Sequence, residues 1–215
     1  MSIIKPGSTV LFQGDSITDA GRELREAGPN LALALGSGYC NHVASQLLRD
    51  RPADGLRFYN RGINGHTVAD LLARWKADTI DLEPDLISIL VGVNDAWHEF
   101  MGGGAGLDRF EATYKSLLDL TRQQLPAVQL ILGEPFALRC GVVTEAFIPH
   151  LRARQRIVQE LADEYGTGFV PYQKAMDEAL TLAPADHWSY DGSHPTAAGH
   201  SVLARCWLET VIQND

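Results

Sequence analysis

Two short segments of the chain carry the residue types of nucleophilic catalysis. Ser16 lies in the segment GDSITD, directly after an apolar run, and Asp191 and His194 lie in the segment DGSHP. A serine hydroxyl is a weak nucleophile near neutral pH, so an imidazole must take its proton as attack begins. A carboxylate on the far ring nitrogen fixes the tautomer of the imidazole and stabilises the cation that forms. We therefore predict a catalytic triad of Ser16, His194 and Asp191 that attacks an ester.

Two further segments supply groups that can stabilise a developing negative charge. Gly65 lies in NRGINGHT and Asn94 lies in GVND. A backbone amide at a glycine and an amide side chain can each donate to the oxyanion of an attacked carbonyl. Each segment also has a simpler reading, because a glycine permits a turn with positive φ and an asparagine can open a loop through an Asx-turn. The joint occurrence of the motifs favours an oxyanion hole built from Ser16, Gly65 and Asn94.

The elements that must position these residues alternate between strand-like and helix-like patterns. Short apolar runs closed by Gly, Asn or Pro predict strands at Thr9 to Gln13, Leu56 to Asn60, Asp85 to Val91, Val128 to Leu132 and Gly168 to Pro171. Helical spacing predicts helices at Tyr39 to Leu48, Val68 to Ile80, Leu107 to Leu125 and Ile148 to Tyr165. This alternation predicts a parallel sheet with helices on both faces. Ligands of such sheets bind beyond the carboxyl ends of the strands, where Ser16, Gly65 and Asn94 would lie.

Helix-start signals refine this arrangement. Thr67 with Asp70, and Asp108 with Glu111, have the spacing of capping boxes. Asp15 or Ser16 can cap a helix after the first strand, which is the alternative to a catalytic role for Ser16. Pro195 suits the first turn of a final helix and holds the preceding His194 in an extended conformation. The imidazole can then face the crevice at the strand ends.

Composition limits the class of protein. The chain has 215 residues, which suits a single domain over 1–215, and its net charge of −9 without a Lys/Arg cluster argues against nucleic acid and anionic membranes as partners. No apolar run approaches the roughly 20 residues of a membrane span. Three widely spaced cysteines and an N-terminus without a leader pattern predict a reducing, cytoplasmic location. We expect no metal or cofactor, and ordinary surface or core roles for the other histidines, which are His42, His66, His98, His150, His187 and His200.

Aromatic and glycine-rich segments flank the proposed catalytic residues. We expect Asp15, Trp97 and Tyr190 to contact substrate, since aromatic faces can stack on sugar rings, although buried packing is the common role of a tryptophan. The segment GGGAG at 102–106 is either a loop over the site or a plain connection.

Together, GDSITD, NRGINGHT, GVNDAW and DGSHP resemble the conserved blocks of the SGNH hydrolases, also called the GDSL esterase and lipase family, in their order and relative position. The resemblance implies a flavodoxin-like three-layer α/β/α sandwich with a five-stranded parallel sheet. It also implies catalytic roles for Ser16, Gly65, Asn94 and His194, with Asp191 as the acid. The chain lacks the GxSxG elbow of the α/β-hydrolases, because Thr18 stands where that motif needs glycine.

The resemblance extends to one branch of the family, the bacterial intracellular acetylxylan esterases. It runs through Gly21-Arg22, the segment GSGY at 36–39, the segment LLARW at 71–75 and the segment at 92–97. It implies a homo-oligomeric esterase that removes acetyl groups from xylo-oligosaccharides or related sugars. The first block reads GDSI in place of GDSL, and the glycine-rich loop after Trp97 departs from the branch.

Other functions remain as alternatives. A lysophospholipase or thioesterase would use the same residues on a longer acyl chain. A carbohydrate-binding module would not require Ser16, Asn94 and His194 together. A phosphatase with Asp15 as nucleophile would need a second acid two residues later, where Ile17 stands.

Overall fold

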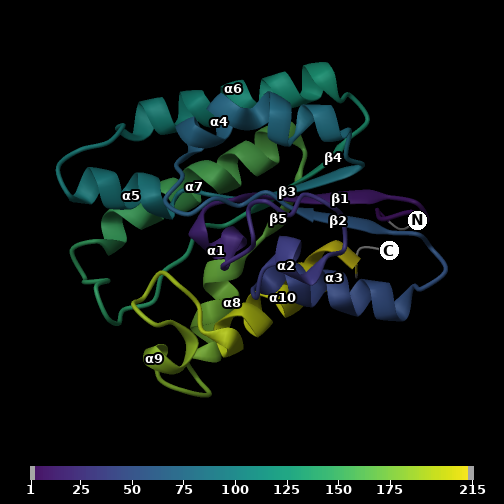
Figure 1. Cartoon of the computed structure of the whole chain (residues 1–215). Coiled ribbons are helices and arrows are strands. Elements are labelled where there is room, and N and C mark those ends of the chain that lie inside the picture. The colour runs from purple at the N-terminus through teal and green to yellow at the C-terminus, as the bar shows by residue number, and fades with distance from the viewer. Residues whose placement is uncertain (1–2, 213–215) are drawn as a thin grey trace.

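A five-stranded parallel sheet runs through the centre of the protein (Figure 1). The structure is a computed structural model that describes residues 3–212, so residues 1–2 and 213–215 of the predicted domain lie outside it. The strands are β1 (Thr9–Gly14), β2 (Arg57–Asn60), β3 (Leu86–Leu90), β4 (Gln129–Gly133) and β5 (Gly168–Val170), in the order β2-β1-β3-β4-β5. The predicted flavodoxin-like sheet is confirmed. The chain reverses its direction of travel across the sheet between β1 and β3, which is where ligands of such sheets bind.

Helices cover both faces of the sheet. Helices α3, α8 and α10 pack on one face, and α4, α6 and α7 pack on the other (Figure 1). The helices are α1 (Ser16–Asp19), α2 (Ala32–Leu35), α3 (Tyr39–Asp50), α4 (Val68–Asp78), α5 (Val93–Phe100), α6 (Leu107–Gln124), α7 (Ile148–Tyr165), α8 (Tyr172–Ala179), α9 (Ala185–Trp188) and α10 (Ala197–Ile212), with a 3₁₀ turn, η1, at Ile80–Leu82.

The two cores follow from the alternation of side chains along buried strands. In β1, Val10 and Phe12 join the core beneath α3 and α10, whereas Leu11 joins the core beneath α4 and α6. Each core contains a fully buried tryptophan whose ring N–H has a partner. Trp207 Nε1 donates to Ser88 Oγ at 3.0 Å, and Trp75 Nε1 donates to Thr121 Oγ1 at 2.8 Å.

The structure confirms one of the two predicted capping boxes and contradicts the other. The box of Thr67 and Asp70 is confirmed at the start of α4. The box of Asp108 and Glu111 is wrong, because α6 starts after Gly106 and no side chain caps it. Asp108 lies instead in the first helical turn, where its charge favours the positive end of the helix. Helix α5 begins directly after β3, so Asn94 lies in a helical turn and does not open a loop.

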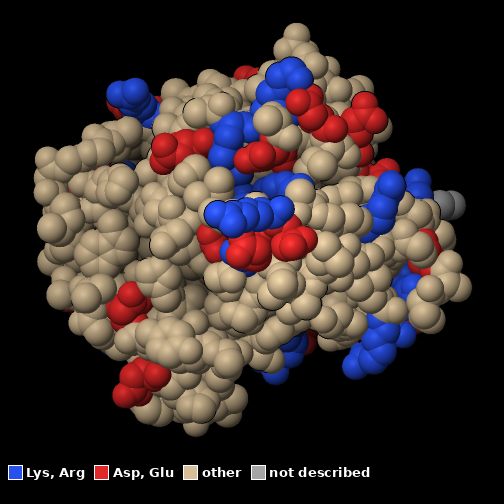
Figure 2. All heavy atoms as spheres, in the orientation of Figure 1, with Lys and Arg blue, Asp and Glu red and all other residues tan. Residues whose placement is uncertain are grey.

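The surface carries mixed charge. On the face drawn in Figure 2, Lys and Arg side chains lie beside Asp and Glu side chains and do not gather into one basic patch. Within residues 3–212, none of the helices is long and apolar enough to cross a membrane. The extent of the domain, the cytoplasmic location and the homo-oligomeric state stay predictions.

Candidate active site

Ser16, His194 and Asp191 form a continuous hydrogen-bonded chain. The Ser16 Oγ to His194 Nε2 distance is 2.9 Å, and the His194 Nδ1 to Asp191 Oδ2 distance is 2.7 Å. A carboxylate only accepts, so Nδ1 must donate to Asp191, and the neutral ring then leaves Nε2 as the acceptor of the Ser16 hydroxyl proton. This is the tautomer that a base acting on a serine needs.

Asp191 is held as an acceptor by its own turn. Its Oδ1 accepts from the backbone N–H groups of Ser193 and His194, each at 2.8 Å. Partial burial acts to raise the pKa of Asp191. The hydrogen bonds from the His194 backbone, the His194 ring and the Ser193 backbone outweigh it and lower that pKa below its ordinary value. Asp191 therefore stays ionised across the pH range in which an imidazole acts as a base.

The turn between α9 and α10 is held by several hydrogen bonds. Ser189 Oγ donates to the His194 carbonyl at 2.9 Å and accepts from the Gly192 N–H at 3.0 Å. Tyr190 N–H also donates to the His194 carbonyl. Gly192 has a φ of +99°, and a Cβ there would lie 2.5 Å from the Leu138 carbonyl oxygen. Glycine is therefore required between Asp191 and His194, which explains its place in the DGSHP segment.

Ser16 begins α1 immediately after β1. A Cβ on Gly14 would lie 2.3 Å from both the Leu90 carbonyl oxygen and Thr18 Oγ1, so only glycine fits between β1 and β3 at this point. Asp15 caps α1 by accepting from the Ile17 N–H at 3.0 Å. Its exposed fraction is 1%, so the prediction that Asp15 contacts substrate is wrong. The side chain is buried because it caps α1, and α1 begins next to the carboxyl end of β1.

Two buried carboxyls lie behind the site. Burial raises the pKa of Asp15 to about 7, with Asp95 raising it further and the Ile17 amide opposing. Burial also raises the pKa of Asp95 to about 6, against the hydrogen bond from the Val68 N–H. The Oδ2 atom of Asp15 is fully buried and has no hydrogen-bond partner among the residues that the structure describes. An ionised Asp15 is therefore costly for the folded protein.

The Gly65 turn lies against the ends of β1 and β3. The Ile63 N–H donates to the Gly14 carbonyl at 3.1 Å, and Asn94 Nδ2 donates to the His66 carbonyl at 3.0 Å. Gly65 has a φ of +79°, as the turn reading expected. Within residues 3–212, neither the Ser16 N–H nor the Gly65 N–H donates to a protein acceptor, so both are free for a ligand. Three strand ends thus bring Ser16, the Gly65 turn and Asn94 to one edge of the sheet.

A cavity of about 570 Å³ opens beside Ser16 and His194. Tyr190 lies at this cavity and is 73% exposed, so its ring is available to a ligand. Sequence reasoning did not assign four polar lining residues to the site, namely Asp19, Ser37, Asn64 and His200. Of these, Ser37 lies in the GSGY segment at 36–39, which the sequence had singled out. The lining residues are Ser16, Ile17, Asp19, Ala20, Gly21, Ser37, Asn64, Tyr190, His194, Pro195, Ala197 and His200.

Trp97 is occupied by packing. Its ring stacks on Phe147 with centroids 4.1 Å apart, and its Nε1 donates to Ser193 Oγ at 3.2 Å. It does not line the cavity, so the expected contact of Trp97 with substrate has no support in this arrangement. The 102–106 segment also contributes nothing to the cavity lining, and Ala105 instead accepts from the buried Arg154.

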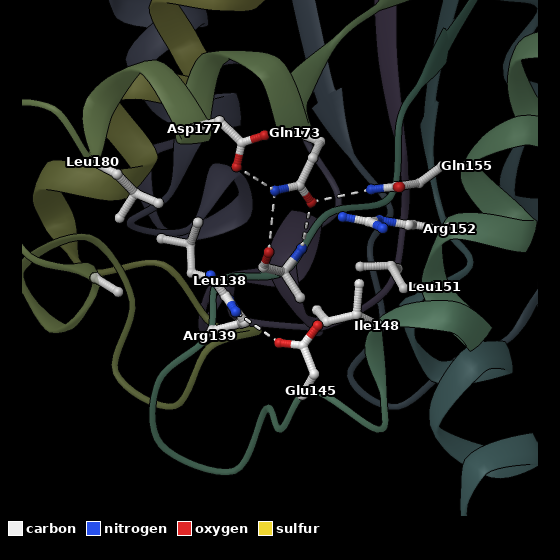
Figure 3. A pocket seen from close by; sticks show the side chains of 12 residues that line it. Leu138, Arg139, Glu145, Ile148, Leu151, Arg152, Gln155, Gln173, Asp177 and Leu180 are labelled. Atoms are coloured by element: carbon white, nitrogen blue, oxygen red, sulfur yellow. Dashed lines mark hydrogen bonds and ion pairs between the residues drawn. The ribbon is translucent and has the colours of Figure 1, made fainter.

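A second cavity, of about 530 Å³, lies between the segment after β4 and helices α7, α8 and α9 (Figure 3). Gln173 lies at its centre and makes hydrogen bonds with Ala137, Gln155 and Asp177. Arg139 forms an ion pair with Glu145 at its edge. Its lining contains no serine, cysteine or histidine, and its two carboxylates are engaged, Glu145 with Arg139 and Asp177 with Gln173. The serine hydroxyl and the imidazole that the predicted acyl transfer needs lie instead at the cavity beside Ser16 and His194.

Comparison with known proteins identifies the family of the chain. A family model for GDSL-like lipases and acylhydrolases matches residues 12–202. An acetylxylan esterase of Geobacillus stearothermophilus is 38% identical over 214 residues, which cover 97% of this chain and 95% of that protein.

Solved structures of the same family have a similar fold. A protein of Parabacteroides merdae described as GDSL-like superposes with a TM-score of 0.94 at 40% identity, covering 98% of this chain and 99% of that one. The Geobacillus stearothermophilus esterase Axe2 superposes with a TM-score of 0.87 at 35% identity, covering 98% and 96%. Catalytic mutants of Axe2 replace a serine, a histidine or an aspartate by alanine. The chain therefore belongs to the GDSL-like lipase/acylhydrolase, or SGNH, family and is a carboxylic ester hydrolase related to acetylxylan esterases.

Proposed function

We propose that the protein removes small acyl groups, chiefly acetyl, from esters of xylo-oligosaccharides or related sugars. The observation that carries the proposal is the hydrogen-bonded chain from Ser16 through His194 to Asp191. The protein is similar over nearly its whole length to an acetylxylan esterase, and this similarity supports an acetylated sugar as substrate. The polar residues that line the cavity, with Tyr190 at its side, support a hydroxylated ligand in place of a long acyl chain.

In the first step Ser16 Oγ attacks the ester carbonyl. The Oγ–C bond forms as the hydroxyl proton moves to His194 Nε2, and Asp191 stabilises the resulting imidazolium. The carbonyl oxygen becomes an oxyanion that accepts from the Ser16 and Gly65 backbone N–H groups and from the Asn94 side chain. The tetrahedral intermediate then breaks its bond to the alcohol, which leaves with the proton from His194.

In the second step water repeats the sequence on the acyl-enzyme. His194 takes a proton from water as the oxygen attacks the acyl carbon, and the same donors hold the second oxyanion. The Ser16 ester bond breaks, Ser16 recovers its proton from His194, and the carboxylic acid leaves. The free N–H groups at Ser16 and Gly65 are available in both steps.

Covalent labelling tests the nucleophile. A fluorophosphonate probe should label the wild type at Ser16, and the Ser16→Ala variant should not be labelled. Ser193→Ala is a matched control, because Ser193 lies in the turn beside His194 and its hydroxyl accepts from Trp97. Labelling of the Ser16→Ala variant at another serine would overturn the assignment.

Chain-length preference tests the substrate class. We expect the wild type to hydrolyse p-nitrophenyl acetate in preference to the butyrate and octanoate esters, and Ser16→Ala to hydrolyse none of them. A preference for octanoate would favour a lysophospholipase or thioesterase. Serine-independent binding of xylo-oligosaccharides without turnover would favour a carbohydrate-binding module.

A further inference from the structure

His200 is a buried histidine that faces the proposed catalytic cavity. It lies in the first turn of α10, its exposed fraction is 8%, and it lines the same cavity as Ser16 and His194. The sequence predicted an ordinary surface or core role for it. Buried polar groups are normally hydrogen-bonded, so the partners of this buried ring at the edge of the cavity need to be identified.

The hydrogen bond at Nδ1 determines the tautomer of His200. The Tyr39 backbone N–H donates to Nδ1 at 3.2 Å, so Nδ1 carries the lone pair and the ring proton sits on Nε2. Burial lowers the pKa of His200 to about 4, and His42 and His194 lower it further. The ring therefore stays neutral near pH 7, and its Nε2–H is a fixed donor.

No acceptor in the described part of the chain takes up this donor. Nε2 has no hydrogen-bond partner among residues 3–212, and it is not one of the fully buried polar atoms that lack a partner. It therefore opens onto the cavity. A Cβ on Gly38 would lie 2.8 Å from His200 Cε1 and 2.5 Å from the Ala20 Cβ. The glycine in the GSGY segment is what allows the ring to approach so closely.

The position of the cavity indicates which part of an ester lies there. His194 delivers its proton to the departing alcohol, so the alcohol oxygen must lie at His194 Nε2. The cavity runs from His194 to His200 and also contains Asp19, Ser37 and Asn64. Its volume of about 570 Å³ exceeds that of an acetyl group many times over. The alcohol portion of the substrate is the part that fits this polar space.

We propose that His200 donates a hydrogen bond from Nε2 to a hydroxyl group of the sugar alcohol, which makes His200 a specificity residue for polyhydroxylated leaving groups. The proposal rests on the proposed esterase function and deepens it. It assigns the GSGY segment a part in substrate selection, since Gly38 and Tyr39 hold the ring in place.

Two substitutions separate the donor from the structural hydrogen bond. His200→Asn keeps an oxygen that can accept from the Tyr39 N–H but loses the donor at the Nε2 position. His200→Gln places an amide N–H near the Nε2 position. His42→Asn is the matched control. His42 lies on α3, close enough to His200 to affect its pKa, but it does not line the cavity.

The readout is the ratio of kcat/KM for a monoacetylated methyl β-xylopyranoside to kcat/KM for p-nitrophenyl acetate, whose alcohol carries no sugar hydroxyl. We expect His200→Asn to lower this ratio about 3- to 10-fold, the worth of one neutral hydrogen bond. His200→Gln should recover most of it, and His42→Asn should leave it within about twofold of the wild type.

The outcomes separate this proposal from the proposed function. Equal losses on both esters in His200→Asn would overturn the role of His200 and leave the esterase function standing. A wild type that hydrolyses p-nitrophenyl acetate but not the xyloside would overturn the sugar substrate, and the His200 proposal with it.

A measurement on the wild type keeps the proposal testable if His200→Asn fails to fold. The ¹⁵N resonances of the His200 ring, identified by their loss in His200→Gln, should report a neutral ring protonated at Nε2. The Nε2 resonance should shift when methyl β-xylopyranoside is added at concentrations that inhibit hydrolysis of p-nitrophenyl acetate. An unshifted resonance under those conditions would overturn the proposal.

Discussion

Replacement of Asp15 by Asn tests the cost of the buried carboxyl that precedes Ser16. Burial raises the pKa of Asp15 from 3.8 to about 7. An acid whose pKa is higher in the folded state stabilises that state fully below its unfolded pKa, and this contribution is lost as pH rises through the folded pKa. The window therefore runs from about pH 4 to about pH 7. A rise from 3.8 to about 7 corresponds to a stability loss of about 4 kcal/mol as an order of magnitude.

Asparagine keeps the oxygen that accepts from the Ile17 N–H and cannot ionise. We expect the free energy of unfolding of Asp15→Asn, minus that of the wild type, to grow by up to about 4 kcal/mol between pH 4 and pH 8. Urea unfolding followed by the fluorescence of the four tryptophans measures both proteins at each pH. The groups that the two proteins share cancel in the difference.

Asp95→Asn provides a graded comparison. Burial raises the pKa of Asp95 to about 6, so the same difference should grow in the same direction but by a smaller amount. A difference between Asp15→Asn and the wild type that is the same at pH 4 and pH 8 would refute the reasoning, because Asp15 would then ionise equally in the folded and unfolded states.

Three further substitutions probe the site and the core. Asp191→Asn presents an amide N–H to His194 Nδ1 and favours the wrong tautomer, so kcat for p-nitrophenyl acetate should fall about 10⁴-fold with the fold retained by circular dichroism; a fall below tenfold would argue against the triad. Asn94→Ala removes an oxyanion donor and should lower kcat about 10²- to 10³-fold with a smaller change in KM, whereas a pure KM effect would point to ground-state binding. Trp207→Phe leaves the buried Ser88 hydroxyl unpaired and should destabilise the protein by about 1–3 kcal/mol in urea unfolding; the double variant with Ser88→Ala should recover part of this loss, and strict additivity would mean that the two side chains are not coupled.

Much of the fold and the proposed triad could be predicted because both depend on local patterns. The strands are short apolar runs, and the structure places all five of their predicted starts within one residue. Asp191 and His194 are three residues apart in one turn, so the pair forms wherever that turn lies. Ser16, Gly65 and Asn94 each follow a parallel strand, and parallel strands deliver their carboxyl ends to one edge.

The orientation and burial of individual side chains were decided only in the tertiary structure. Asp15 is a polar residue beside the proposed nucleophile, yet in the structure its side chain is buried and caps α1 by accepting from the Ile17 N–H. Trp97 stacks on Phe147, a contact between segments that no local pattern links. The place of the His200 ring depends on two residues that are distant in sequence. The Tyr39 N–H donates to the ring, and Gly38 has no side chain that would clash with it. Local spacing determines which residues meet at a strand end, whereas burial is a property of the neighbours that other elements bring, and these are set by long-range packing.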